Sequence, residues 1–166
     1  LWTRLDNAGT SVVITQRKHA KKVRKIVERL PELKRVVVVD AEGFKLKDPE
    51  VALDLDILPP VGNFKVHPTT AESPSILHYT SGTTGQPKGA QHVHYSLISQ
   101  YITAKWVLDL RPDDIYWCNA DPGWVTGTSY GIIGPWANGI TQAVLDSGFN
   151  ADNGYDVIAR NKVSVW

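Results

Sequence analysis

The spacing of apolar residues at the start of the chain predicts a strand, a helix and a second strand. Ser11–Thr15 is a β-branched run typical of a strand, and Lys18–Leu30 repeats apolar residues with helical spacing. Arg35–Asp40 is an almost uninterrupted apolar run, which indicates a parallel strand buried on both faces. Together the three elements form a βαβ unit, so residues 1–40 predict the start of a doubly wound α/β fold. The helical stripe consists of Ala20, Val23, Ile26, Val27 and Leu30.

Residues 41–75 interrupt this pattern and are predicted to form a Pro-rich surface connection. Prolines cannot donate a backbone hydrogen bond, so a cluster of them disfavours regular structure. Within the connection, the residues around Val51–Leu55 predict one short helix. The prolines are Pro49, Pro59, Pro60, Pro68 and Pro74.

Alternating strand and helix patterns return in residues 76–166. Ile76–Tyr79 predicts a buried strand, and Tyr95–Leu110 predicts an amphipathic helix with Ile98, Ile102 and Trp106 in the core. The whole chain therefore predicts an α/β fold, a mostly parallel sheet flanked by helices. Further predicted elements are the strands Ile115–Cys118, Thr141–Leu145 and Val163–Trp166, and the helices Ile133–Ala137 and Tyr155–Asn161.

Composition narrows the class of protein. A chain of 166 residues with 42% hydrophobic residues can bury one core, so we expect a single domain or part of one. The net charge of +1 gives no reason to expect nucleic acid or a membrane surface as a partner, and no apolar stretch is long enough for a transmembrane helix. The single cysteine, Cys118, cannot form an internal disulfide and fits a reducing compartment, the cytoplasm.

The stretch Tyr79–Gly89, which follows the predicted strand Ile76–Tyr79, has the composition of a phosphate-binding loop. Glycines let the backbone N–H groups approach a phosphate closely, hydroxyls add donors, and a lysine adds a positive charge. It lacks the Walker A order, because Gly85 is followed by Gln86-Pro87-Lys88. The expected phosphate-binding residues are Thr80, Ser81, Gly82, Thr83, Thr84, Gly85 and Lys88.

A second segment, Asn119–Gly131, combines a predicted turn at Asp121-Pro122-Gly123 with apolar and hydroxyl side chains. Open α/β sheets bind ligands at the carboxyl ends of their strands, where this turn is expected. Trp124, Val125 and Thr126 suit a small pocket for a short acyl group, although Trp124 could instead simply pack at the start of the next helix. Thr126 or Thr128 is expected to cap the helix that runs through Ile133–Ala137.

His92 and His94 are two residues apart, so in an extended segment their side chains would lie on one face and could present two metal ligands. No Cys, Asp or Glu stands beside them in the sequence to complete a site. We therefore expect packing or hydrogen bonding near the loop, and we assign no metal-ligating residue.

Both segments resemble a known family. Tyr79–Gly89 resembles the signature of the AMP-forming adenylate synthetases, which include acyl-CoA synthetases, peptide-synthetase adenylation domains and luciferases. Ala120–Gly131, followed by Gly134–Gly139, is more specifically similar to the AMP-forming acetyl-CoA synthetases (acetate–CoA ligases). The similarity is close over residues 76–146 and looser before them, and many acetate enzymes carry His where this chain has Thr128.

The resemblance implies that ATP, Mg²⁺, acetate and CoA are the small molecules involved. Acetate and ATP would form acetyl-AMP and diphosphate, and CoA would then release AMP and give acetyl-CoA. The loop would contact the β- and γ-phosphates, while Val125 and Thr126 would border the acyl pocket. Propionate or another acid remains an open alternative to acetate, and a non-catalytic nucleotide-binding module remains a second one. The oligomeric state is left open.

The resemblance also predicts what this chain lacks. The chain contains no Met, begins at Leu1 and ends at Trp166 inside a predicted strand, so we expect a piece of the large N-terminal domain of a longer enzyme. In this interpretation residues 1–40 form the βαβ unit, 41–75 the connection, and 76–166 the segment with the phosphate loop and acyl pocket. The C-terminal domain with its catalytic Lys is absent, so no catalytic residue is assigned and the isolated chain is expected to be inactive.

Overall fold

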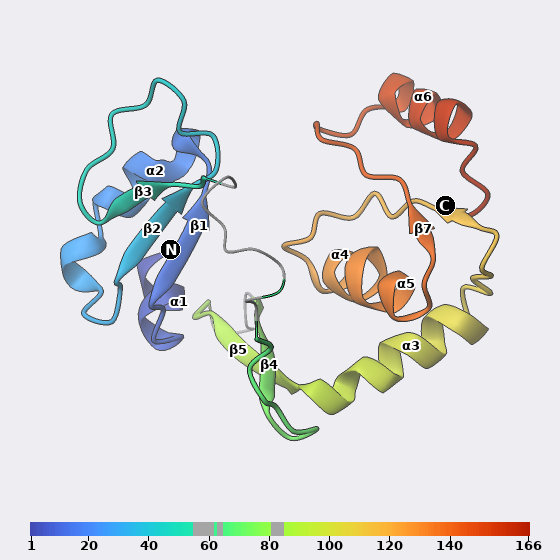
Figure 1. Ribbon diagram of the computed structural model, residues 1–166, viewed down its shortest axis with the longest axis horizontal. Coiled ribbons are helices and arrows are strands. Elements are labelled where there is room, and N and C mark those ends of the chain that lie inside the picture. Colours follow the sequence, from blue (N-terminus) through green and yellow to red (C-terminus); the bar gives the residue numbers. More distant parts are fainter. Residues whose placement is uncertain (55–61, 63–64, 81–84) are drawn as a thin grey trace. The chain divides into compact units, whose positions relative to one another are not determined.

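The described residues, 1–54, 62, 65–80 and 85–166 of a computed structural model, fall into two units. The first unit comprises Leu1–Pro68 and Tyr79–Ala90, and the second comprises Thr69–His78 and Gln91–Trp166. Each unit combines strands with helices, and both contain parallel strand pairs (Figure 1). The α/β fold with a parallel sheet and helices, predicted from the sequence, is confirmed.

The first unit is built on a three-stranded parallel sheet with the strand order β1-β2-β3 (Figure 1). The helix between β1 and β2 completes the predicted βαβ unit, and β3 extends the sheet beyond it. Its elements are α1 (Trp2–Asn7), β1 (Val12–Thr15), α2 (Arg17–Arg24), the 3-10 helix η1 (Val27–Arg29), β2 (Arg35–Val38) and β3 (Glu50–Ala52).

The strand β3 corrects the prediction of a short helix around Val51–Leu55, of which Leu55 lies outside the described residues. Val51 pairs with Val37 in parallel register, and the backbone N–H of Leu53 donates to the carbonyl of Val38. The sequence pattern of three residues could not distinguish one helical turn from a short edge strand. The neighbouring strand β2 decided the outcome, because it supplies hydrogen-bond partners that a lone turn would not have.

Burial in the first unit follows the predicted helical stripe but differs from it at the sheet. Ala20 and Val23 of α2 are buried, as are Val36 and Val38 of β2. Val37 between them is only half-buried, so one face of β2 is packed more tightly than the other. The expectation of a strand buried on both faces is therefore wrong. The predicted helix is also shorter than expected, because α2 ends six residues before Leu30 and the 3-10 helix η1 continues the apolar stripe.

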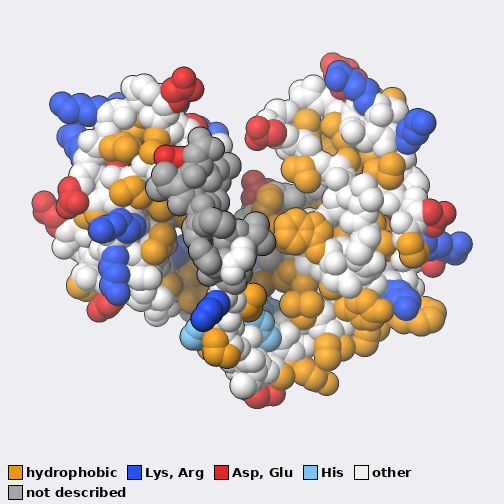
Figure 2. Space-filling model, in the orientation of Figure 1, with side chains coloured by type: hydrophobic (Ala, Val, Ile, Leu, Met, Phe, Trp, Pro, Cys, Tyr) orange, Lys and Arg blue, Asp and Glu red, His pale blue; other side chains and the backbone are white. Residues whose placement is uncertain are grey.

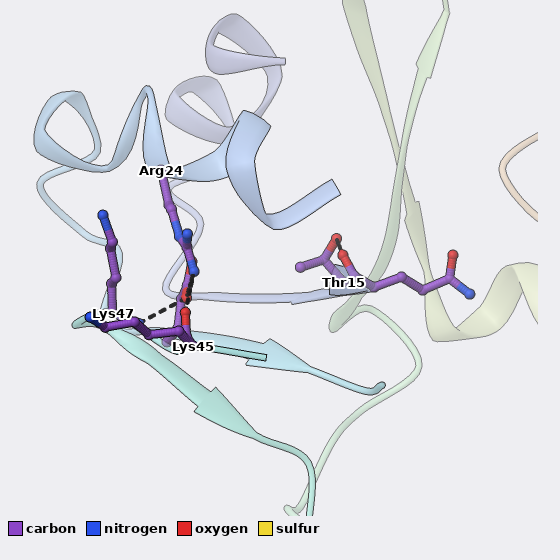
Figure 3. Close-up of polar contacts among 6 residues, drawn as sticks. Thr15, Arg24, Lys45 and Lys47 are labelled. Atoms are coloured by element: carbon purple, nitrogen blue, oxygen red, sulfur yellow. Dashed lines mark hydrogen bonds and ion pairs between the residues drawn. The ribbon is translucent and has the colours of Figure 1, made fainter. Parts of the chain in front are cut away.

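An ion pair joins α2 to β3 (Figure 3). The guanidinium of Arg24 donates from Nε and from a terminal nitrogen to the two carboxylate oxygens of Glu50, each at 2.6 Å, and also to the carbonyl of Lys45. The backbone N–H of Lys47 donates to Glu50 at 3.0 Å, and the Phe44 ring lies under the guanidinium. The Glu50 side chain is 2% exposed and that of Arg24 is 23% exposed, so a largely buried contact fixes the helix on the sheet.

Strands β4 (Pro74–Thr80) and β5 (Lys88–Val93) are hydrogen-bonded neighbours, and the chain then enters the helices of the second unit. A strand over Ile76–Tyr79 was predicted correctly, but its burial was not, because Leu77 is exposed and the rest is at most half-buried. The further elements are η3 (His94–Ser96), α3 (Leu97–Trp106), β6 (Ile115–Tyr116), α4 (Val125–Thr128), the π-helical turn η4 (Ser129–Ile133), α5 (Gly134–Ala137), β7 (Thr141–Gln142) and α6 (Ala151–Asn161).

The core of the second unit reverses the face predicted for α3. Trp106 is 74% exposed, and Ile98 and Ile102 are exposed as well, so hydrophobic side chains gather on the surface over α3 (Figure 2). The buried residue of this helix is Ala104, which packs where Gly134 of α5 approaches so closely that a Cβ on that glycine would lie 2.9 Å from the Ala104 methyl. Close packing of two small residues therefore decides which face of α3 is buried.

Two parallel strands complete this core. β6 pairs with β7 in parallel, and Val165 bridges Tyr116 in parallel, so the predicted strand over Val163–Trp166 is present as a single bridge. The core residues Ala104, Leu110, Tyr116 and Ile140 are buried, with Leu108, Cys118 and Val165 packed against them.

Candidate functional site

The predicted phosphate loop connects the end of β4 with the start of β5. Thr80 is the last residue of β4 and Lys88 is the first residue of β5, and both are exposed. Gly85 has φ +80°, a backbone conformation that glycine adopts without strain. Ser81, Gly82, Thr83 and Thr84 lie outside the described residues.

The strand that leads into the loop is tied to the first helix of the chain. The Tyr79 hydroxyl donates to Oδ1 of Asn7 at 2.6 Å, next to the end of α1. No ion pair holds Lys88 among the described residues, so within them its ammonium group has no acidic competitor for a bound phosphate.

The second predicted segment forms a tight turn that leads directly into α4. The carboxylate of Asp121 accepts from the Gly123 backbone N–H at 2.7 Å, and its carbonyl accepts from the Trp124 N–H at 2.9 Å. Trp124 is the N-cap of α4 and makes no side-chain capping bond, so the predicted capping by Thr126 or Thr128 is wrong. The helix starts earlier than predicted, because the turn at Asp121 already orients its first residues.

The three residues predicted for the acyl pocket lie together at this entry. Trp124 is 73% exposed, and Val125 and Thr126 are also exposed. Gly127 then faces the turn so closely that a Cβ there would meet the carbonyl oxygens of Asp121 and Ala120. The close approach holds the segment against the turn.

A cavity of about 520 Å³ lies within the second unit, lined in part by the same turn. Its walls come from the residues that follow β6 and β7, which is the carboxyl end of these parallel strands and the usual ligand position in open α/β sheets. Trp124, Val125 and Thr126 are not among its lining residues, whereas Asp121 and Pro122 are. Aromatic lining comes from Trp117, Trp136 and Phe149, and polar lining from Asn119, Asp121, Gln142 and Ser147.

The cavity includes residues that the sequence pattern did not single out. Cys118 was expected inside a strand, but β6 ends at Tyr116, and the half-buried thiol lines the cavity beside Gly131. Burial raises the pKa of the neighbouring Tyr116 phenol, so that side chain stays protonated in the core. The sequence signal that could have revealed this cavity was the presence of tryptophans near turn residues, since aromatic groups commonly line ligand pockets.

A polar contact near the turn was also missed. His78 of β4 lies with Nε2 3.1 Å from Oγ1 of Thr128, and that hydroxyl lies 2.7 Å from the carbonyl oxygen of Pro122. A histidine within an otherwise apolar strand pattern was the signal in the sequence, because a half-buried imidazole needs a hydrogen-bond partner.

The histidine pair considered for metal binding is divided between two elements. His92 lies in β5, with its ring edge-on to the His78 ring at 5.6 Å between centroids, whereas His94 begins η3. Within residues 1–54, 62, 65–80 and 85–166, no group of three or more His, Cys, Asp or Glu side chains is placed to hold a metal ion.

None of the helices in the described part of the chain is long and apolar enough to cross a membrane.

Comparison with known proteins gives a consistent result. Residues 2–166 match the family described as AMP-binding enzyme. Acetyl-coenzyme A synthetase of Bacillus subtilis (strain 168) is 40% identical over 98% of this chain and 28% of its own length. The protein of the same name from Pyrobaculum arsenaticum is 34% identical over 98% of this chain and 27% of its own length. The chain thus spans somewhat over a quarter of these curated relatives.

Solved structures agree on the fold. The crystal structure of Brucella canis acyl-CoA synthetase aligns with a TM-score of 0.83 and 26% identity, covering 99% of this chain and 29% of that one. Anthranilate CoA ligase AuaEII, solved in complex with anthranoyl-AMP, aligns with a TM-score of 0.84 and 25% identity, covering 98% of this chain and 31% of that one.

Proposed function

The chain belongs to the AMP-binding enzyme family, and from that premise we propose that it carries the ATP-phosphate and acyl sites of an AMP-forming acyl-CoA synthetase whose acid is acetate. The observation that carries the proposal is the 40% identity to an acetyl-coenzyme A synthetase over 98% of the chain. Because this chain spans 28% of that relative, the activity, substrates and partners of the whole protein are part of the proposal.

The proposed reaction has two steps. A carboxylate oxygen of acetate attacks the α-phosphorus of ATP, the bond from that phosphorus to the bridging oxygen breaks, and diphosphate leaves with acetyl-AMP remaining. The CoA sulfur, having lost its proton, then attacks the acetyl carbon, and AMP leaves with the electron pair of the broken carbon–oxygen bond. The protein's part in the first step is to position the reactants and stabilise phosphate charge.

In this proposal the loop between β4 and β5 binds the β- and γ-phosphates. The exposed Thr80 hydroxyl, the glycine conformation at Gly85 and the exposed Lys88 ammonium supply a donor, a close backbone approach and a positive charge. These features support the assignment of the full set predicted from the sequence: Thr80, Ser81, Gly82, Thr83, Thr84, Gly85 and Lys88.

Trp124, Val125 and Thr126 are the proposed acyl-binding residues. Their support is the turn that aligns them at the start of α4, at the carboxyl-end side of β6. A pocket formed by these residues would select acids by size, and one methylene discriminates roughly 10- to 200-fold.

Magnesium and CoA belong to the proposal as partners of the reaction. No described cluster of acidic or histidine side chains fits a magnesium ion, so we assign it no protein ligand here. The cytoplasm is the proposed location, because the reaction uses a free CoA thiol, which persists in a reducing compartment.

A different acid is the second candidate, and a specific observation favours keeping it. The cavity of about 520 Å³ beside the acyl segment is lined by three aromatic side chains, and one structural neighbour is named an anthranilate CoA ligase. Propionate and an aromatic acid therefore belong in the same experiment as acetate. A non-catalytic nucleotide-binding module is the remaining alternative.

The experiment is acid-dependent exchange of labelled diphosphate into ATP, measured on the natural full-length protein, with acetate, propionate and anthranilate compared. Lys88→Ala is expected to lower the exchange rate by roughly 100-fold, the effect typical of losing one group that stabilises developing charge. Lys21→Ala, which removes an exposed lysine of α2, is the matched control and should leave exchange unchanged.

The outcomes separate the candidates. Exchange with acetate that depends on Lys88 supports the proposal, and exchange with another acid corrects the substrate. Absence of exchange, with ATP still protecting Tyr79–Gly89 from proteolysis, indicates the non-catalytic nucleotide-binding module instead of a synthetase. Absence of both exchange and protection would contradict the proposed function.

A further inference from the structure

The contact between His78 and Thr128 defines where the imidazole proton must be. Thr128 Oγ1 has one proton, and the carbonyl oxygen of Pro122 at 2.7 Å can only accept it. The same hydroxyl oxygen must therefore accept from His78 Nε2, 3.1 Å away, so Nε2 carries a proton. His78 Nε2 therefore donates to Thr128 Oγ1, and Thr128 Oγ1 donates to the Pro122 carbonyl oxygen.

The other ring nitrogen is left without a partner. His78 Nδ1 is buried and has no hydrogen-bond partner among the described residues. The ring of His92 stands at 80° to that of His78 with 5.6 Å between centroids, a packing contact that offers no hydrogen bond. An unsatisfied buried polar atom is costly, so an apolar residue would serve better if packing were the sole requirement at this position.

The contact between His78 and Thr128 stabilises the start of α4. Pro122 lies in the turn and Thr128 is the last residue of α4, so the bond between them closes a loop around the three proposed acyl-binding residues. The Thr128 backbone N–H also donates to the Trp124 carbonyl at 3.0 Å. The hydroxyl of Thr128 can rotate, and the donor from His78 fixes it on Pro122.

We propose that His78 is a positioning residue for acid binding, which acts through Thr128 to hold Trp124, Val125 and Thr126 at the start of α4. This inference rests on the proposed function, because it assigns the acid site its geometry. In this proposal His78 acts through Thr128 on the affinity for the acid and takes no part in the chemical step.

Two pairs of variants test the inference. His78→Leu removes the donor at similar size, whereas His78→Gln retains a side-chain N–H that can reach Thr128. Thr128→Val removes the hydroxyl at the same shape, whereas Thr128→Ser retains it. In the diphosphate exchange assay, H78L and T128V are expected to raise KM for the acid about tenfold, the size of one lost hydrogen bond, with KM for ATP unchanged.

The conservative variants provide the decisive readout. H78Q and T128S should recover KM for the acid to within about threefold of the unmodified protein, since each keeps the bond. The double variant H78L/T128V should be no weaker than either single variant, because both remove the same contact. Nitrogen-15 NMR of labelled histidine should show the His78 proton on Nε2, and this signal should change in T128V.

The results distinguish this inference from the proposed function. If exchange occurs and H78L and T128V leave KM for the acid unchanged, the positioning role is overturned and the proposed function stands. If no acid supports exchange in the unmodified protein, both fall. Should H78L fail to fold, T128V against T128S decides. An Nε2 that carries no proton overturns the inference independently of activity.

Discussion

The Arg24–Glu50 pair of the first unit and the His78–Thr128 contact of the second use polar atoms in opposite ways. Both oxygens of Glu50 accept hydrogen bonds, from Arg24 and from the Lys47 backbone. His78 uses one ring nitrogen and leaves the other buried without a partner among the described residues. A completed network stabilises the fold, whereas an incomplete one costs stability and so has its reason elsewhere.

This difference in hydrogen bonding indicates that the two contacts have different roles, one in stability and one in acid binding. Arg24 and Glu50 join a helix to a strand and involve none of the predicted site residues. His78 and Thr128 hold the turn and helix that carry Trp124, Val125 and Thr126. We therefore expect changes at the first contact to lower stability and changes at the second to lower acid binding.

The largest effect is expected at Gly127, which lies in the segment closed by the bond between Thr128 and Pro122. Gly127→Ala should lower the free energy of unfolding by about 3 kcal/mol, because the added Cβ meets rigid backbone atoms of Asp121 and Ala120. Chemical denaturation measures it. Gly148→Ala, where a Cβ has open space, is the control and should change little. A G127A protein as stable as the unmodified one would show that the turn and α4 are not held together this closely.

At the first contact, Glu50→Gln should lower the free energy of unfolding by about 2 kcal/mol, because it removes one partner of a largely buried ion pair. The effect is below that of a fully buried pair, since the Arg24 side chain is 23% exposed and regains some hydration. Thermal unfolding measures it, with the exposed Glu28→Gln as control. If E50Q lowered diphosphate exchange as strongly as it lowers stability, the two contacts would not have separate roles.

The same pair predicts a dependence on pH. Hydrogen bonds from the Arg24 guanidinium hold the pKa of the Glu50 carboxyl below its ordinary value of 4.5. The unfolded chain therefore takes up this proton first as the pH falls, so the stabilisation is complete above that value and is lost as the pH drops through the lower pKa of the folded protein. Unfolding measured from about pH 6 to about pH 3 should show the advantage over E50Q shrinking. A constant difference would contradict the assignment.

The smallest effect is expected on the exposed face of α3. Trp106→Gln in the chain of 166 residues should change the free energy of unfolding by less than about 0.5 kcal/mol, because the side chain is 74% exposed. Ala104→Leu is the contrasting variant and should destabilise, since Ala104 is buried against Gly134. A large loss of unfolding free energy in W106Q would support the buried face of α3 that the sequence pattern predicted.

Part of the candidate site could be predicted from the sequence, because short-range chemistry determines it. The glycine, hydroxyl and lysine composition of Tyr79–Gly89 indicates a phosphate loop without knowledge of its neighbours. The strand before the loop was predicted correctly, whereas the strand β5 after it was not predicted. The roles of the residues in the loop and in Trp124–Thr126 remain predictions. The His78–Thr128 contact could not be predicted, because 50 positions separate its partners along the chain.

The sequence by itself determined the βαβ unit, the parallel α/β class and the two segments that resemble the family, because each depends on local periodicity or on a contiguous motif. Tertiary structure alone decided that Glu50–Ala52 is a strand and that α3 buries Ala104 in place of Trp106. It also decided that His78 contacts the Thr128 hydroxyl. In each of these cases the deciding partner lies far away in the chain, and a window of neighbouring residues carries no information about a distant backbone or a glycine surface that packs against it.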